Sequence, residues 1–315
     1  MHVRQFRLAA LIIGLATLFV VVDARAQQRP PQEGEPAEGQ PGRHLDEARY
    51  NEAVQGLSAA EPEARIASVE AIAHGGWRFR RQAAPHLRRL IRHDPDWRVR
   101  ASSGRAIGRL SLREAVPDLV RALRDDQVDV RIVAAAALWR LPDAAAVPAL
   151  LDLLNDADPT ARQWGALALG VTGDTRATDA LLALLNDTAE AVRLDALRSL
   201  GRIADPAALS GLRDFIVDTS RPEEERLEAI NALASLRGPD KMNALIRLLE
   251  DPNTNIRLHI VNALGQVGDA LVIPTLRRRR AAETAAAIRT AIDEAIAAIE
   301  ERARERASEA AATPG

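Results

Sequence analysis

An arginine returns at nearly constant intervals through most of the sequence, and this repeat limits the possible folds more than any other feature. The intervals run from 31 to 35 residues, and the arginines are Arg65, Arg100, Arg131, Arg162, Arg193, Arg226, Arg257 and Arg289. Seven residues after each arginine stands an aliphatic side chain: Ile72, Ile107, Leu138, Leu169, Leu200, Leu233, Leu264 and Ile296. A period of this length, kept over eight units, indicates a protein whose repeats bury their apolar faces by stacking on one another.

Each unit contains sequence for two helices. The second, which we call the B helix, begins near the repeated arginine, and the first, the A helix, is seen as leucines at helical spacing in residues 116–123, 147–154, 180–185 and 245–249. Aspartates stand where the A helices need N-caps, at Asp143, Asp174, Asp205 and Asp269. Alanine is abundant and aromatic residues make up only 3% of the chain, which favours helix over sheet. The sequence therefore predicts an all-α superhelix, a solenoid of about eight two-helix repeats.

Two of the units also resemble a known family. The run Val192-Arg193-x-x-Ala196-Leu197-x-x-Leu200-Gly201, and the run from Ile256-Arg257 to Leu264-Gly265, resemble HEAT repeats of the short type named after phycobilisome (PBS) lyases, an armadillo-like helical fold. The resemblance covers roughly residues 45–300. On the B helix the repeated arginine emerges beside the buried stripe, where an unpaired charge would be costly. An aspartate stands six residues before the arginine in five units, and the resemblance implies a ladder of aspartate–arginine pairs between adjacent repeats, built from Asp94, Asp125, Asp156, Asp187 and Asp251 with Arg100, Arg131, Arg162, Arg193 and Arg257.

The N-terminal residues read as a targeting sequence. Residues 1–26 combine Arg4 and Arg7, an apolar run and the motif Ala24-Arg25-Ala26, which predicts a cleaved signal peptide, with an uncleaved anchor as the alternative. A flexible linker rich in proline, glycine and glutamate is expected over residues 27–44, the repeats over 45–307 and a flexible tail over 308–315. We therefore expect an exported protein, resident in a bacterial periplasm, with no transmembrane span after cleavage.

The amino-acid composition and the histidine pattern indicate a protein without a catalytic site. Without cysteine the chain cannot carry a disulfide, a thiolate nucleophile, cysteine-bound zinc or an iron–sulfur cluster. None of the six histidines is followed by glutamate, although the resemblance to HEAT-like deoxyhypusine hydroxylase would imply iron held by His-Glu pairs. We expect no catalytic, metal or cofactor site, and a scaffold for protein–protein interaction. The alternative is an enzyme related to that oxidoreductase or to the HEAT-like bilin lyases.

One face of the B helices is the candidate binding surface. The side chains two, five and nine residues after each arginine point away from the buried stripe and are expected to line the concave face of a HEAT-type solenoid. An apolar patch is flanked there by arginines on both sides, a composition typical of interface hot spots. The predicted partner-binding residues are Arg105, Arg109, Arg140, Trp164, Leu167, Val171, Arg198 and Arg202. A partner segment with an apolar anchor and acidic flanks would fit this face.

A second candidate surface is the basic segment 76–113, which contains eleven arginines against two aspartates. Basic segments with aromatic residues often bind nucleic acid, but export argues against that partner here. An anionic envelope component is the alternative partner. The sequence leaves the identity of the partner and the oligomeric state open.

Overall fold

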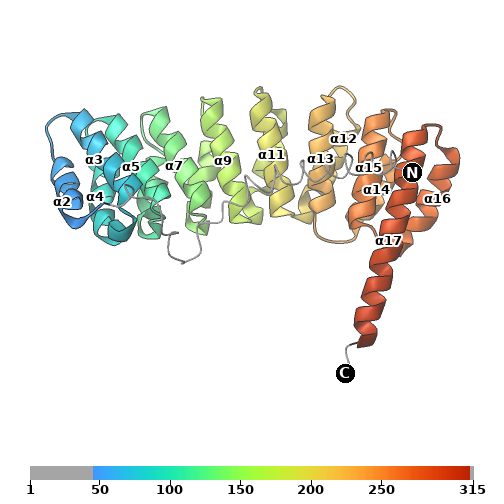
Figure 1. Cartoon of the computed structure of the whole chain (residues 1–315). Coiled ribbons are helices and arrows are strands. Elements are labelled where there is room, and N and C mark those ends of the chain that lie inside the picture. The colour runs from blue at the N-terminus through green and yellow to red at the C-terminus, as the bar shows by residue number, and fades with distance from the viewer. Residues whose placement is uncertain (1–44, 313–315) are drawn as a thin grey trace, which may run out of the picture. The chain divides into compact units, whose positions relative to one another are not determined.

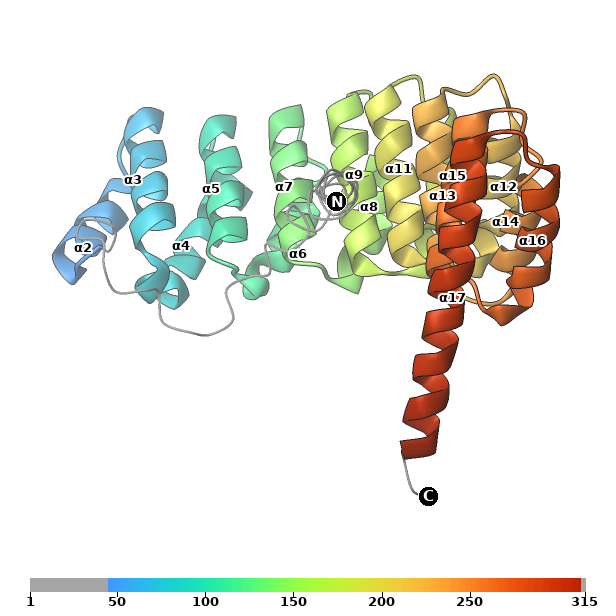
Figure 2. The ribbon, with the colours of Figure 1, turned by 45° about the vertical axis from the view of Figure 1, so that its right-hand side comes forward.

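The computed structural model describes residues 45–312, and all of their regular structure is helical. The helices form a row of antiparallel pairs in which the B helices make one layer and the A helices a second layer behind it (Figures 1 and 2). The predicted all-α solenoid is confirmed. The expected signal peptide and linker, residues 1–44, lie outside the described residues.

The A layer and the B layer alternate along the chain. The A helices are α2 (Glu47–Gly56), α4 (Arg80–His93), α6 (Val116–Ala122), α8 (Val147–Leu153), α10 (Thr178–Ala183), α12 (Leu209–Val217), α14 (Asp240–Leu248) and α16 (Ile273–Ala282). The B helices are α3 (Pro62–Gly75), α5 (Trp97–Arg109), α7 (Val128–Arg140), α9 (Pro159–Thr172), α11 (Glu190–Ile203), α13 (Glu223–Ser235), α15 (Thr254–Val267) and α17 (Ala286–Ala312). Short 3₁₀ turns lie at η1 (Trp77–Phe79), η2 (Arg113–Ala115), η3 (Ala144–Ala146), η4 (Thr175–Ala177), η5 (Leu184–Asn186), η6 (Pro206–Ala208) and η7 (Ala270–Val272).

Four of the 3₁₀ turns carry the aspartates that the sequence places at the starts of A helices. The carboxylate of Asp143, for example, accepts a hydrogen bond of 2.9 Å from the backbone N–H of Ala145. Asp174, Asp205 and Asp269 cap η4, η6 and η7 in the same way. Each turn then leads directly into an A helix, so the cap lies one turn earlier than the helix that it was expected to start.

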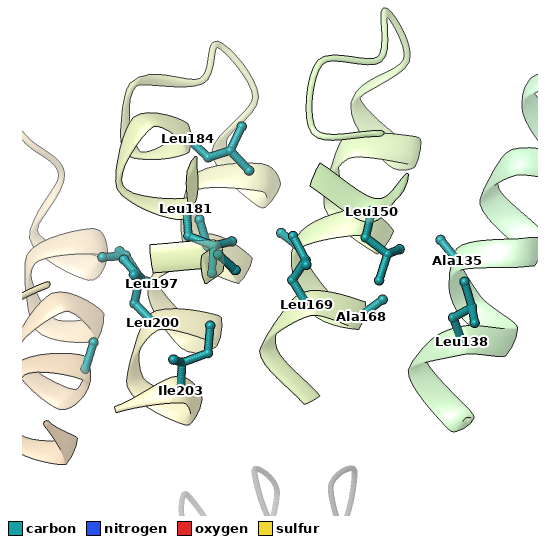
Figure 3. Packing of buried hydrophobic residues seen from close by; sticks show 14 of the residues in the cluster. Ala135, Leu138, Leu150, Ala168, Leu169, Leu181, Leu184, Leu197, Leu200 and Ile203 are labelled. Carbon is teal, nitrogen blue, oxygen red and sulfur yellow. The ribbon is translucent and has the colours of Figure 1, made fainter. Parts of the chain in front are cut away.

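The core lies between the two layers and continues from repeat to repeat. Leu138 of α7, Leu169 of α9 and Leu200 of α11 are buried at equivalent positions, and Leu150 and Leu181 of the A layer are buried with them (Figure 3). The aliphatic residue seven positions after the arginine is buried in every repeat except the last, where Ile296 is half-buried. Ile296 differs because no further B helix follows α17 within the described residues.

Neighbouring B helices approach one another closely where glycine stands eight residues after the repeated arginine. A Cβ atom built on Gly201 of α11 would lie 3.0 Å from Ala232 Cα of α13, and one on Gly108 of α5 would lie 3.1 Å from Ala137 Cβ of α7. Gly170 and Gly265 face the next B helix at similarly short distances. These glycines therefore serve the close packing of neighbouring B helices.

The last helix is longer than the sequence predicts. Helix α17 continues to Ala312, so residues 308–312 are helical, and the expectation of a flexible tail from residue 308 was wrong for them. The alanine, glutamate and arginine residues of this stretch are good helix formers, and they extend a helix that packing has already nucleated. Within residues 45–312, no helix has the length and apolar character needed to cross a bilayer.

Candidate protein-binding surface

The repeated arginines form bidentate ion pairs between adjacent repeats. Arg162 donates from Nε and Nη2 to the two carboxylate oxygens of Asp187 at 2.7 and 2.8 Å. Arg131 holds Asp156 in the same manner, at 2.6 and 2.9 Å. The equivalent pairs are Arg65 with Asp94 and Arg100 with Asp125. Each of these four arginines thus pairs with the carboxylate of the next repeat. It does not pair with the side chain of the residue six positions before it in its own repeat.

Within its own repeat, the arginine instead donates to the backbone carbonyl of the residue six positions before it. Arg162 Nη1 donates to the carbonyl of Asp156 at 2.8 Å, and Arg131 Nη1 donates to the carbonyl of Asp125 at 2.9 Å. The Asp156 carboxylate also accepts the backbone N–H of Asp158 at 3.0 Å and so closes the turn before α9. One aspartate therefore joins the arginine of the repeat before it, its own turn and the arginine of its own repeat. We call this chain of contacts the arginine ladder.

The ladder changes partners at two places. Arg193 pairs with Glu225, which is fully buried, and Arg257 pairs with Glu283. Arg226 donates to Asp251 and to the carbonyl of Ile216 instead of to its own turn. Two features of the sequence mark these changes: the 33-residue interval before Arg226, and the glutamate six residues before Arg289. The repeat pattern did not predict either glutamate, because the recurring acid of the other repeats is aspartate.

The pairs set the acidity of the ladder carboxylates. The guanidinium of Arg162 lowers the pKa of Asp187, and that of Arg131 lowers the pKa of Asp156. Burial alone would raise the pKa of Glu283, but hydrogen bonds from Arg257, the Ala285 N–H and Arg279 lower it to about 2. These carboxylates therefore remain ionised well below the pH at which free aspartate and glutamate take up protons.

We expect the protein to lose stability in acid because of this ladder. The folded-state pKa values lie below the ordinary 3.8 of aspartate and 4.5 of glutamate, so the unfolded chain takes up protons first as the pH falls. The stabilisation is complete above those ordinary values and is lost as the pH falls through the folded values towards about 2. Urea midpoints measured at several pH values should be level above about pH 5 and then decline. The Arg162→Ala variant should decline less steeply, and a slope equal to that of the unchanged protein would contradict this assignment.

Beyond the ladder, the outer surface of the B layer carries the residues predicted to bind a partner. We call this surface, made by the residues two, five and nine positions after each repeated arginine, the open face. Arg105, Arg109, Arg140 and Arg202 are exposed there, and none of them makes an ion pair within the described residues. Arg109 Nη1 lies 3.2 Å from His74 Nε2 on the neighbouring B helix. Four guanidinium groups of the open face are thus available to a ligand.

The apolar patch lies among these arginines. Trp164, Leu167 and Val171 of α9 are half-buried. The ring of Trp164 meets Trp139 of α7 edge to face, with ring centroids 6.3 Å apart. The patch is therefore supported from the adjacent repeat, and it presents apolar surface without a fully exposed aromatic ring.

Arg198 differs from the other predicted arginines because it is already paired. Its Nη1 donates to Asp195 at 2.8 Å, and its Nε lies 3.7 Å from Glu228. Asp195 also accepts a bond of 2.6 Å from Gln163 Nε2 and is buried between α9 and α11. The structure therefore separates Arg198 and Asp195, which hold neighbouring B helices together, from the arginines that are free to bind a partner.

Desolvation shifts several pKa values on the same face. Burial raises the pKa of Glu228 and lowers that of His259, whose Nε2 lies 2.7 Å from Asn231 Oδ1. Burial also lowers the pKa of Arg202, and the charge of Asp195 counteracts part of that effect. Arg202 is therefore a cation without a paired carboxylate among the described residues, and an incoming carboxylate would stabilise its charge.

The basic segment 76–113 is partly neutralised in the fold. Arg88 and Arg92 both pair with the buried Asp118, which lies just beyond the segment. Arg98 pairs with Asp96 and Glu63, and Arg100 belongs to the ladder. Seven of the eleven arginines make no ion pair within residues 45–309, so the free charge is smaller than the composition suggests. In the same residues, no cluster of three or more histidine, aspartate or glutamate side chains is placed to hold a metal.

Comparison with known proteins relates most of the chain to one family. Residues 51–139, 122–189, 147–224 and 216–297 match the family description HEAT repeats. A deoxyhypusine hydroxylase of Arabidopsis thaliana is 41% identical over 61 residues, and the match spans 19% of this chain and 19% of that protein. An engineered protein of known structure matches with a TM-score of 0.50 and 21% identity, over 79% of this chain and 77% of its own. The complex of CpcE and CpcF of phycocyanin lyase from a Nostoc species is also 21% identical, with a TM-score of 0.46 over 80% of this chain and 99% of that one. At 21% identity, the structure of the engineered protein bears on the fold alone.

Proposed function

Because the chain belongs to the HEAT-repeat family, we propose that it is a non-catalytic scaffold that binds a protein partner on the open face of its B layer. One observation carries the proposal: four exposed arginines without ion pairs among the described residues surround a half-buried apolar patch. Apolar surface flanked by arginine is the composition at which protein interfaces concentrate their binding energy. The signal-like residues 1–26 support the further proposal that this scaffold acts outside the cytoplasm, in a periplasm.

The partner should be lost when the apolar patch becomes charged. We expect the tagged full chain to capture a defined partner from the cells that make it, and the Leu167→Asp variant to lose that partner because a carboxylate would be desolvated in the interface. The matched control is Leu151→Asp, which alters a half-buried leucine on the A helix of the same repeat. Urea unfolding curves first establish that both variants are folded. Capture of the partner by each folded variant is then measured by mass spectrometry. Equal capture by the protein and by Leu167→Asp would show that the open face is not the binding surface.

Two alternatives compete with this proposal. Seven arginines of the basic segment have no carboxylate partner among the described residues, which supports association with an anionic envelope component. The short match to deoxyhypusine hydroxylase and the family's enzymatic members support an enzyme. We favour the scaffold because its residues occupy equivalent positions on neighbouring B helices, from α5 to α11.

A further inference from the structure

The open face carries a regular row of side chains near the ends of the B helices. The residue nine positions after the repeated arginine is His74 in α3, Arg109 in α5, Arg140 in α7, Val171 in α9 and Arg202 in α11. Because all B helices run in the same direction and are offset by one repeat, equivalent positions lie at the same height along the layer (Figure 2). The row therefore reads cation, cation, apolar and cation from α5 to α11. We call Arg109, Arg140 and Arg202 the arginine row.

Contacts within the row show how its side chains lie. Arg109 reaches towards α3, where its Nη1 lies 3.2 Å from His74 Nε2. The Arg140 side chain leans towards α5, because a Cβ atom built on Gly108 would lie 3.7 Å from Arg140 Cδ. Both arginines lean towards the preceding B helix, so the distance between these two side chains follows the spacing of the helices.

That spacing matches one conformation of a peptide. Packed helices lie about 8–10 Å apart, and neighbouring B helices are in close contact at their glycines. A polyproline II helix has three residues per turn and rises about 3.1 Å per residue, so every third side chain returns to the same side after about 9 Å. A β-strand fits less well, because side chains three residues apart in a strand point to opposite sides.

We propose that the open face binds an extended, acidic, proline-rich segment of a partner protein in the polyproline II conformation. The segment crosses the B helices with carboxylates at positions i, i+3 and i+9, which pair with Arg109, Arg140 and Arg202. An apolar side chain at i+6 lies on Val171 and Leu167. Arg105, one turn from Arg109 on α5, adds a second cation at the first carboxylate. This inference rests on the proposed function, since it specifies the partner of the same face.

Charge complementarity supports this occupant over a basic or a neutral segment. The three guanidinium groups of the row are exposed, and none of them makes an ion pair with a carboxylate of the described residues. Desolvation lowers the pKa of Arg202, a cost to the charged form that a paired carboxylate would offset. Polyproline II segments also lose little conformational entropy on binding, because they are already extended in solution.

A labelled ten-residue peptide tests the proposal by fluorescence anisotropy with the full chain. The peptide carries glutamate at its first, fourth and tenth positions, leucine at its seventh and proline elsewhere. A permuted peptide of the same composition has glutamate at the first, third and eighth positions and leucine at the fifth, so its side chains no longer share one side. We expect the permuted peptide to bind at least about tenfold more weakly. Raising the salt concentration from about 50 to 300 mM should weaken the binding of the designed peptide.

Charge-reversing variants test the row itself. The double variant Arg140→Glu with Arg202→Glu should bind the designed peptide at least about tenfold more weakly. The matched control, Arg121→Glu with Arg247→Glu, makes the same charge change at exposed A-helix arginines without ion pairs among the described residues, and should stay within about twofold. Equal binding of the permuted peptide, equal loss in the control, or no binding of the designed peptide would each overturn the inference. If the partner is still captured and is lost in Leu167→Asp, the proposed function stands although this inference has failed.

Discussion

Replacing Arg162 by alanine should lower the free energy of unfolding by about 3 kcal/mol, because it leaves the Asp187 carboxylate without its bidentate partner in a mostly buried site. The two side chains are only 14% and 7% exposed, so water cannot easily replace the lost contact. The carbonyl of Asp156 loses its bond from Arg162 Nη1 at the same time. One substitution therefore removes the ion pair to the next repeat and a bond within its own turn. Urea unfolding followed by circular dichroism measures the change.

The matched control is Arg124→Ala. Arg124 also bridges to the following repeat, at 2.7 Å from Asp152, but both side chains are more than 60% exposed. Such a pair contributes about 0–1 kcal/mol, so this variant should be close to the unchanged protein. Arg162→Lys should fall between the two, because an ammonium group keeps the charge but cannot make the bidentate contact. If Arg162→Ala and Arg124→Ala were equally stable, the ladder would not hold the repeats together.

The ladder could be predicted in outline from the sequence, and its exceptions show where prediction ends. A charged residue recurring beside an apolar stripe must be paired, and the recurring aspartates supply the partners. Glu225 lies inside α13, immediately before Arg226 and not six residues before it, so no fixed spacing identifies it. Its role depends on the path of residues 218–222, which is a property of the fold.

The open face was predicted less completely, and the physical reason is contact between repeats. Position and helical period place Arg198 and Arg202 together on the surface of α11. Arg198 pairs with Asp195 within α11 itself, but only the neighbouring helix α13 adds Glu228, and Arg202 makes no ion pair among the described residues. The burial of Asp195 likewise depends on Gln163 from the preceding repeat. A period shows which side of a helix a residue occupies, but not what meets it there.

Helix propensity was underestimated at the end of the chain for a related reason. The residues after 307 lack an apolar stripe, which suggests a flexible tail when they are considered alone. They follow a helix fixed by the buried Ile288, Ile292 and Ile299, so they need no nucleation of their own. A good helix former therefore remains helical beyond the last packed turn.

Replacing Gly201 by valine should destabilise the protein by about 3 kcal/mol, because the new side chain has no space between α11 and α13. A Cβ atom at this position already lies 3.0 Å from the Cα of Ala232. The obstacle is backbone, which cannot turn aside as a flexible side chain would. The two helices must separate, and that separation weakens both the burial of Leu200 and Leu233 and the pair between Arg193 and Glu225.

Intrinsic propensity acts in the opposite direction, which makes the experiment decisive. Valine is a better helix former than glycine, so an unobstructed Gly201→Val substitution in α11 would be neutral or stabilising. Ala191→Val, at an exposed site near the start of the same helix, supplies the control for adding a β-branched side chain and should cost about 0.5 kcal/mol. Urea midpoints of the two variants give the comparison. If Gly201→Val were as stable as Ala191→Val, α11 and α13 could not lie as close together as the contact at Gly201 indicates. The helix spacing from which the arginine row is argued would then be wrong.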